Sequence, residues 1–189
     1  MNVLLFSALS LCFISSVICF RFMLGPGRWL VLNAMQCENP EQYDVNITIS
    51  IKKLNRTHDR FNILAESAKD LEDSFLYGIQ IDVFQKVDGG FKFYERLSNP
   101  CLCKYIKRHA KENMERALTL AGVDPPDCPI AGNRLEIPNF VMDYRELPKI
   151  GVYGTFETRA YGILRKKKIA CYKILLNFDE ISDDYDDDE

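Results

Sequence analysis

Apolar and polar residues alternate along much of the chain, most clearly in DVNITISIKKLNRT, residues 44–57. Four β-branched residues, Val45, Ile47, Ile49 and Ile51, are separated there by polar ones. Successive side chains of a strand point to opposite faces, so this pattern predicts a half-buried strand. A register slip of one residue would turn all four apolar side chains to water, at roughly 1.5–3 kcal/mol each. The register of this strand is therefore strongly specified.

The same alternation predicts further strands along the chain. They cover residues 28–35, 60–66, 75–87, 91–97, 134–144, 152–164 and 169–178. Turn residues separate them, among them Asp88-Gly89-Gly90, where glycine supplies the positive φ of a tight hairpin. About seven to eight antiparallel strands with a turn at roughly every tenth residue predict a mainly β fold, a β-sandwich or β-cup.

One segment changes to a helical period. Between about residues 101 and 121, apolar side chains recur at steps of three and four residues, with charged residues opposite. The apolar stripe includes Cys103, Met114 and Leu118. Gly122 and two prolines follow, as is typical of a helix end. The chain therefore inserts one long helix between its strands.

The first twenty residues read as a signal peptide. Val3–Phe6 and Leu9–Phe20 are apolar apart from small serines, and the first charge is Arg21. The alternative is a membrane anchor, for which so short an apolar run is at the lower limit. Two tripeptides, at Asn46 and Asn55, match the N-glycosylation signal, and Asn46 falls on the polar face of its strand. Together these features predict a secreted glycoprotein.

Removing the signal leaves five cysteines, an odd number. Cys37 and Cys171 lie near the two ends of the domain, where a bridge would contribute roughly 5 kcal/mol on the chain-entropy estimate. Cys128 then pairs with Cys101 or Cys103, and Cys103 is favoured because it lies on the buried stripe of the helix. Cys101 is free, intermolecular or the true partner of Cys128. Oxidised cysteines suit a secreted chain.

Charge is distributed unevenly along the chain. Residues 179–189 hold eight of the 27 acids and no base, while the other residues carry 24 bases and 19 acids. This tail is predicted to be disordered, because repeated like charges cannot bury surface. Tyr185 within it is a candidate for sulfation. Residues 21–178 are predicted to form one domain, and a basic run of four residues is too short to indicate nucleic-acid binding.

Catalytic and metal-binding patterns are absent from the sequence. It contains two histidines, His58 in a predicted turn and His109 on a charged helix face, both interpreted as solvated surface residues. There is no GxSxG, HExxH, phosphate loop or Cys-His arrangement, and no cysteine spacing typical of a zinc site. The sequence predicts a protein without enzymatic activity, metal or cofactor.

The order of short motifs resembles a known family. CENP and VNITISIKKLNRT, a Gly-Gly hairpin, the CKYI helix, DCPI, IPNF and LPKIGVYG follow one another as in an insect family of small secreted proteins. That family includes the chemosensory CheB proteins and is similar to the ganglioside-activator and lipid-recognition (ML) superfamily. The resemblance implies an immunoglobulin-like β-cup whose sheets hold a hydrophobic ligand between them. Cys101 and the acidic tail depart from the pattern.

The resemblance gives the aromatic residues a functional interpretation. By themselves they are interpreted as core filling, whereas the resemblance implies that they line an apolar cavity. The expected ligand is a lipid or other apolar small molecule, a chemosensory ligand among them. The expected lining consists of Tyr77, Ile79, Ile81, Phe91, Phe93, Met114, Leu118, Phe140, Tyr153, Phe156 and Tyr161.

A second hypothesis needs no small ligand. The basic turn Arg165–Lys168, the cationic helix face and the acidic tail suit electrostatic recognition. They favour an extracellular interaction protein that modulates a cell-surface receptor. The sequence leaves the oligomeric state undetermined.

Overall fold

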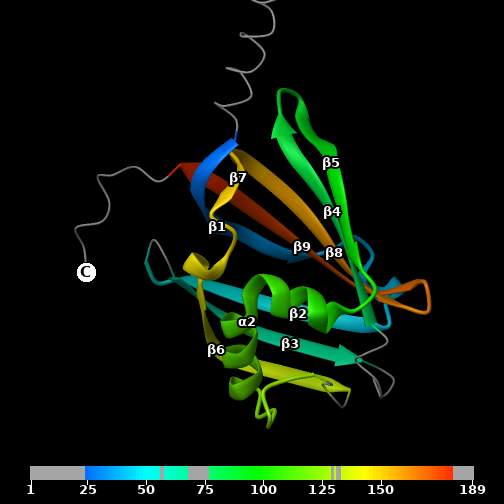
Figure 1. Ribbon diagram of the computed structural model, residues 1–189. Coiled ribbons are helices and arrows are strands. Elements are labelled where there is room, and N and C mark those ends of the chain that lie inside the picture. The colour runs from blue at the N-terminus through cyan, green and yellow to red at the C-terminus, as the bar shows by residue number, and fades with distance from the viewer. Residues whose placement is uncertain (1–23, 56–57, 68–76, 129, 131–132, 181–189) are drawn as a thin grey trace, which may run out of the picture.

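The computed structural model describes residues 24–55, 58–67, 77–128, 130 and 133–180, which form two antiparallel sheets and one long helix (Figure 1). The larger sheet is curled and has the order β5-β4-β8-β9-β1-β7. Its strands, in chain order, are β1 (Leu24–Gln36), β4 (Tyr77–Val87), β5 (Gly90–Asn99), β7 (Ile150–Val152), β8 (Gly154–Leu164) and β9 (Lys167–Glu180). The smaller sheet has the order β2-β3-β6, with β2 (Val45–Lys53), β3 (His58–Ser67) and β6 (Arg134–Asp143).

The mainly β fold with one inserted helix is confirmed. The helix, α2 (Leu102–Leu120), lies within the range predicted for it. The described residues form nine strands, somewhat more than predicted, because a short additional strand, Ile150–Val152, pairs with β1 just before the strand expected from 152 onward. The predicted signal peptide and most of the acidic tail lie outside the described residues.

The alternation of apolar and polar residues in β2 gives the strand one buried and one exposed face, as predicted. Val45 is buried, while Asn46, Thr48 and Ser50 are exposed on the opposite face. The inner residue Ile49 pairs with Ile63 of β3, which pairs in turn with Ile137 of β6. The smaller sheet thus presents one continuous apolar face.

The two sheets meet at one side and are bridged by the helix at the other. β2 lies against β1 and β9, whereas α2 lies between β6 and the β4–β5 hairpin, in front of the space between the layers in Figure 1. The main core cluster fills that space with Val31 from the larger sheet and Phe61, Ile137 and Phe140 from the smaller one. The predicted cup is therefore packed with side chains where its two sheets face each other.

A short 3-10 helix, η3 (Tyr144–Glu146), connects β6 to β7 and anchors α2. The helix has a non-helical residue at Ala110, with φ −157° and ψ 54°, which interrupts its backbone hydrogen bonds. The amide of Asn113 just beyond donates to the Glu146 carboxylate at 2.7 Å. The Asn113 side chain also exchanges two hydrogen bonds with the backbone of Asp143. The second half of α2 is thus held at the end of β6.

Two disulfides add covalent links. Cys37 pairs with Cys171 and Cys103 with Cys128, the pairings expected from the sequence. The first joins the chain after β1 to β9, and the second ties the start of α2 to the segment after it. Cys101 is a half-buried free thiol.

Candidate functional site

Five aromatic side chains meet on the inner face of the curled sheet. Trp29 lies against Phe178 and Phe156, with ring centroids 4.7 and 6.1 Å away. Tyr153 stacks on Phe178 at 5.7 Å, and Tyr94 meets Phe156 edge-on at 6.0 Å. We call these five residues, contributed by β1, β5, β8, β9 and the β7–β8 link, the aromatic cluster.

Strand register and a glycine place these rings together. Phe178 pairs with both Trp29 and Gly154, and it shares the inward face of β9 with Ile174 and Leu176. A Cβ atom at Gly27 would lie 2.8 Å from the Phe178 ring, closer than real Cβ contacts allow. Glycine at this position is therefore needed for the strand to pass over Phe178.

The polar groups of two rings in the cluster donate hydrogen bonds to backbone carbonyls. The indole N–H of Trp29 donates to the Pro148 carbonyl at 3.0 Å, and the Tyr153 hydroxyl donates to the Pro26 carbonyl at 2.9 Å. Burial and the nearby charge of Glu180 raise the pKa of Tyr153, so its hydroxyl remains neutral. The cluster thus presents ring faces rather than charged or reactive groups.

Exposure rises across the cluster. Phe178 is fully buried and Phe156 is nearly so, Trp29 and Tyr153 are half-buried, and Tyr94 is 46% exposed. Three of the five rings therefore reach solvent at one end, while the other two rest on the core. A partly open, rigid aromatic surface of this kind suits an apolar ligand.

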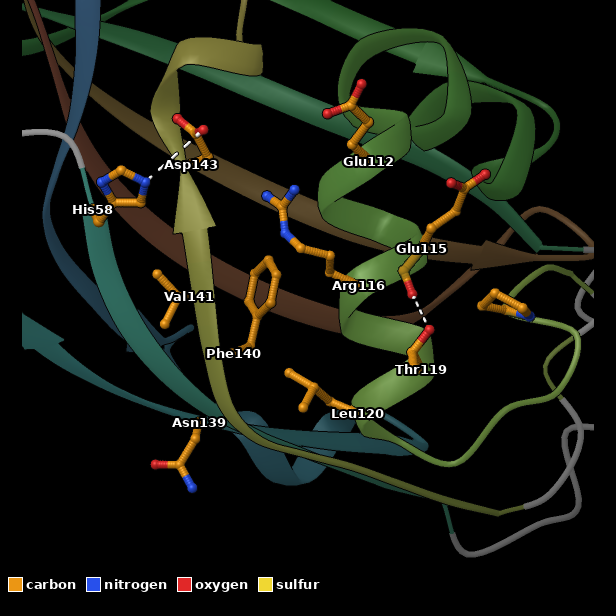
Figure 2. A pocket seen from close by; sticks show the side chains of 11 residues that line it. His58, Glu112, Glu115, Arg116, Thr119, Leu120, Asn139, Phe140, Val141 and Asp143 are labelled. Atoms are coloured by element: carbon orange, nitrogen blue, oxygen red, sulfur yellow. Dashed lines mark hydrogen bonds and ion pairs between the residues drawn. The ribbon is translucent and has the colours of Figure 1, made fainter.

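A groove of about 910 Å³ runs between α2 and β6 (Figure 2). Phe140, Val141, Leu120 and Pro126 contribute apolar surface to it, and Arg116 extends from α2 toward β6. Three acids, Glu112, Glu115 and Asp143, form half of the remaining wall. The groove is thus wide and open, with a charged rim.

The charges of this groove are largely neutralised within the protein. Arg116 forms an ion pair with Glu146 at 2.8 Å. Asp143 is bound by the Arg145 guanidinium, which lowers the pKa of Asp143 although partial burial opposes the shift. His58 lies 3.8 Å from the same carboxylate, so it borders the groove rather than lying free in a turn. We regard these contacts as anchoring α2 and β6.

Two smaller hollows lie on the outer faces of the sheets. One, of about 270 Å³, follows polar side chains of the smaller sheet, including Thr48, Ser50 and Asn62. The other, of about 120 Å³, lies where the chain after Cys37 crosses the larger sheet near Arg159 and Tyr161. The smaller hollow is mainly polar, whereas the larger one also has apolar side chains in its wall, among them Leu64 and Pro138.

The structure brings most of the predicted lining residues to inward positions. Tyr77, Phe140 and Phe156 are buried, as are Met114 and Leu118 on α2. The remaining inward members are half-buried: Ile79, Ile81 and Tyr153. They are spread over different core clusters, and only Tyr153 and Phe156 belong to the aromatic cluster.

Three predicted lining residues point elsewhere. Tyr161 pairs with Gln80, so it lies on the opposite face from Ile79 and Ile81, and the Lys168 ammonium sits 3.4 Å from its ring centroid. Phe91 and Phe93, on the edge strand β5, are 40% and 57% exposed. Phe93 packs against Phe84 on the outer face. The expectation that these three residues line the inter-sheet cavity is wrong, because strand alternation turns them outward.

Three members of the aromatic cluster were missed as lining residues: Trp29, Tyr94 and Phe178. Phe178 could have been found, because it continues the inward alternation of Ile174 and Leu176. Tyr94 could not, since a bulge between Val83 and Phe84 leaves it as an extra residue in β5 and sets its direction.

The other predicted sites are accessible. The side chains of Asn46 and Asn55 are exposed, as glycan attachment requires. His109 is exposed and contacts the Tyr105 ring. Within the described ranges, acidic, histidine and cysteine side chains form no group of three that could hold a metal.

No protein-family model matches the chain, and no curated protein matches it in sequence. Among the described residues, no helix combines the length and the apolar character needed to cross a membrane.

Proposed function

We propose that the protein is a non-catalytic extracellular carrier that binds a lipid or another apolar small molecule against its aromatic cluster. The observation that carries this proposal is the graded exposure of the five rings, from fully buried Phe178 to half-exposed Tyr94. Sites for apolar ligands consist mainly of such fixed aromatic and aliphatic surface with few polar groups.

Several features support this assignment. Two disulfides suit an oxidising, extracellular compartment. The Trp29 and Tyr153 polar groups already bind backbone oxygens, so the cluster offers a binding surface without an evident nucleophile or base. The resemblance to the CheB and lipid-recognition proteins favours the same class of ligand, and a chemosensory molecule would belong to it.

Trp29 makes the proposal directly testable, because it is the chain's single tryptophan. We expect a fatty acid brominated along its chain to quench Trp29 fluorescence, since quenching requires contact between bromine and indole. Native mass spectrometry of the secreted protein should also show a co-purifying apolar molecule at near-equal stoichiometry.

Adjacent residues on β5 provide a matched pair of variants. Tyr94→Ala removes the exposed ring of the cluster and should weaken binding about three- to tenfold, the size of one aromatic contact. Phe93→Ala removes a still more exposed ring from the opposite face and should leave binding unchanged. Equal effects of the two variants, or no quenching by any apolar probe, would refute the proposal.

The second hypothesis, a receptor-modulating interaction protein without a small ligand, makes the opposite prediction. It expects a ligand-free mass for the secreted protein and no response of Trp29 to apolar molecules. It also expects receptor binding that weakens as salt screens the charges.

A further inference from the structure

Charge is segregated between the two ends of the larger sheet. The turn between β8 and β9 contains Arg165 and Lys166, enclosed by the pair Leu164 and Lys167. β9 then runs to Glu180 at the opposite end, and residues 181–189 after it contain six acids and no base. The β8–β9 turn and the C-terminal end of β9 lie at opposite sides of Figure 1.

The β8–β9 turn has an unfavourable backbone for its sequence. Arg165 and Lys166 have φ values of 48° and 68°, the left-handed conformation that a two-residue hairpin turn of this type requires. Asparagine and glycine adopt it easily, and other residues pay a conformational cost. A strained turn that holds two cations is a reason to look for a function of those cations.

The four basic residues of this turn differ in their contacts with the described part of the chain. Lys167 pairs with Asp44 at 2.9 Å, and Lys168 covers the Tyr161 ring. Arg165 and Lys166 are exposed, and among the described residues neither has a hydrogen-bond or ion-pair partner.

The start of α2 adds two more cations at the same end. Leu102 and Leu164 pack against the same buried cluster, which places the helix start beside the turn. Lys104 and Arg108, one helical turn apart, are both exposed and have no partner in the part of the chain that the structure describes. We call Lys104, Arg108, Arg165 and Lys166 the electropositive end.

We propose that the electropositive end binds the acidic segment 181–189 of a second copy of the chain. The fourteen residues of β9 separate its ends by about 43 Å at the usual strand rise. Nine residues after Glu180 span at most about 31 Å when fully extended. The backbone of this segment, tethered at the far end of β9, falls short of its own β8–β9 turn, which favours an electrostatic complement on another molecule. The contact is head-to-tail and joins two different surfaces.

Sedimentation velocity at low and high salt tests this contact with three proteins. We expect the full mature chain to self-associate at about 50 mM salt and to be monomeric at about 500 mM, where exposed charges are screened. Deleting residues 181–189 should abolish self-association. The double variant Arg165→Asn/Lys166→Gly should weaken it at least about tenfold while raising Tm, because Asn-Gly suits this turn.

Mixing the two altered proteins provides the decisive measurement. The tail-deleted chain keeps the basic turn and the turn variant keeps the tail, so each should be monomeric alone and the mixture should contain a 1:1 complex. Lys52→Gln/Lys53→Gln removes the same charge from exposed positions at the far end of β2 and should not change self-association.

Three results would overturn the proposal. They are a monomeric full chain at low salt, a mixture without the 1:1 complex, and an effect of the Lys52/Lys53 variant equal to that of the turn variant. Turn-dependent binding to anionic phospholipid vesicles by a chain that stays monomeric would likewise assign the electropositive end to a membrane instead.

Discussion

At the scale of single residues, one hydroxyl group connects β3 to the chain that leaves β6. The Tyr144 hydroxyl donates to the Asp59 carboxylate at 2.6 Å, and the two residues are only 5% and 3% exposed. Burial, together with the bond to Asp59, raises the pKa of Tyr144 far above its usual value. The hydroxyl therefore stays protonated, and able to donate, well above the pH at which an ordinary tyrosine ionises.

Tyr144→Phe tests the importance of this bond. The variant keeps the ring but leaves a buried carboxylate oxygen without its donor, which should lower the free energy of unfolding by about 1–3 kcal/mol. Urea denaturation monitored by circular dichroism measures the change. Tyr172→Phe is the control, because Tyr172 is as buried but donates only a 3.4 Å bond to the Ile49 carbonyl. Equal losses in the two variants would contradict the special role of the Asp59 pair.

At the scale of elements, α2 is held in two separate halves. The first half is tied by the Cys103–Cys128 disulfide and the ion pair between Lys107 and Asp127. The second half begins after Ala110, and its free amide at Asn113 finds the Glu146 carboxylate on η3. Helix ends need such partners because their first amides lack acceptors within the helix.

Removing the Glu146 carboxylate should destabilise the second half of α2 and leave the first half unchanged. We expect Glu146→Ala to cost about 1–3 kcal/mol of stability, since both the amide of Asn113 and the guanidinium of Arg116 lose a charged partner. Hydrogen exchange should accelerate at Asn113 and in the turns after it, but not between Leu102 and His109. Glu136→Ala, at an exposed ion pair on β6, is the control. Uniform acceleration along α2 would show that the two halves are not independent.

At the scale of the whole molecule, paired carboxylates couple stability to pH. Burial tends to raise the pKa of Asp82, but hydrogen bonds and charge from Arg96 outweigh it and lower that pKa. The pKa of Asp143 is lowered by Arg145, and that of Asp127 by Lys107. A carboxylate whose pKa is lower in the folded state stabilises the fold above its unfolded pKa and loses this effect as pH falls through the folded value.

The free energy of unfolding should therefore begin to decline as the pH falls below about 4, the ordinary pKa of aspartate. Asp82→Asn should reduce stability at pH 7 by about 1.5–3 kcal/mol, the usual worth of a hydrogen bond to a charged group, and make the acid decline shallower. Glu112→Gln, at an exposed position, should change neither quantity. Urea titrations at pH 7 and pH 3 measure both. An unchanged slope in Asp82→Asn would exclude this residue as a source of the pH dependence.

The sequence predicts which aromatic side chains share a face of the sheet wherever the strand that carries them is clearly recognised. Phe156 and Tyr161 are five residues apart in β8, so one strand cannot send both to the same face, and this parity already separates them in the sequence. Phe91 and Phe93 do share a face, but which face is set by the register with β4 and by the bulge before Phe84. Without that register, the sequence of β5 does not distinguish exposed aromatic residues from inward-facing ones.

The sequence by itself determined the elements. Local alternation, helical periodicity and turn residues act within a few positions of the chain, so the strands, α2 and the half-buried character of β2 followed from them. The tertiary structure decided which rings meet. Trp29, Phe156 and Phe178 come from β1, β8 and β9, and their contact depends on sheet order, curl and a glycine that lets one strand pass over a ring. Such relations join distant segments, and no pattern within a single segment encodes them.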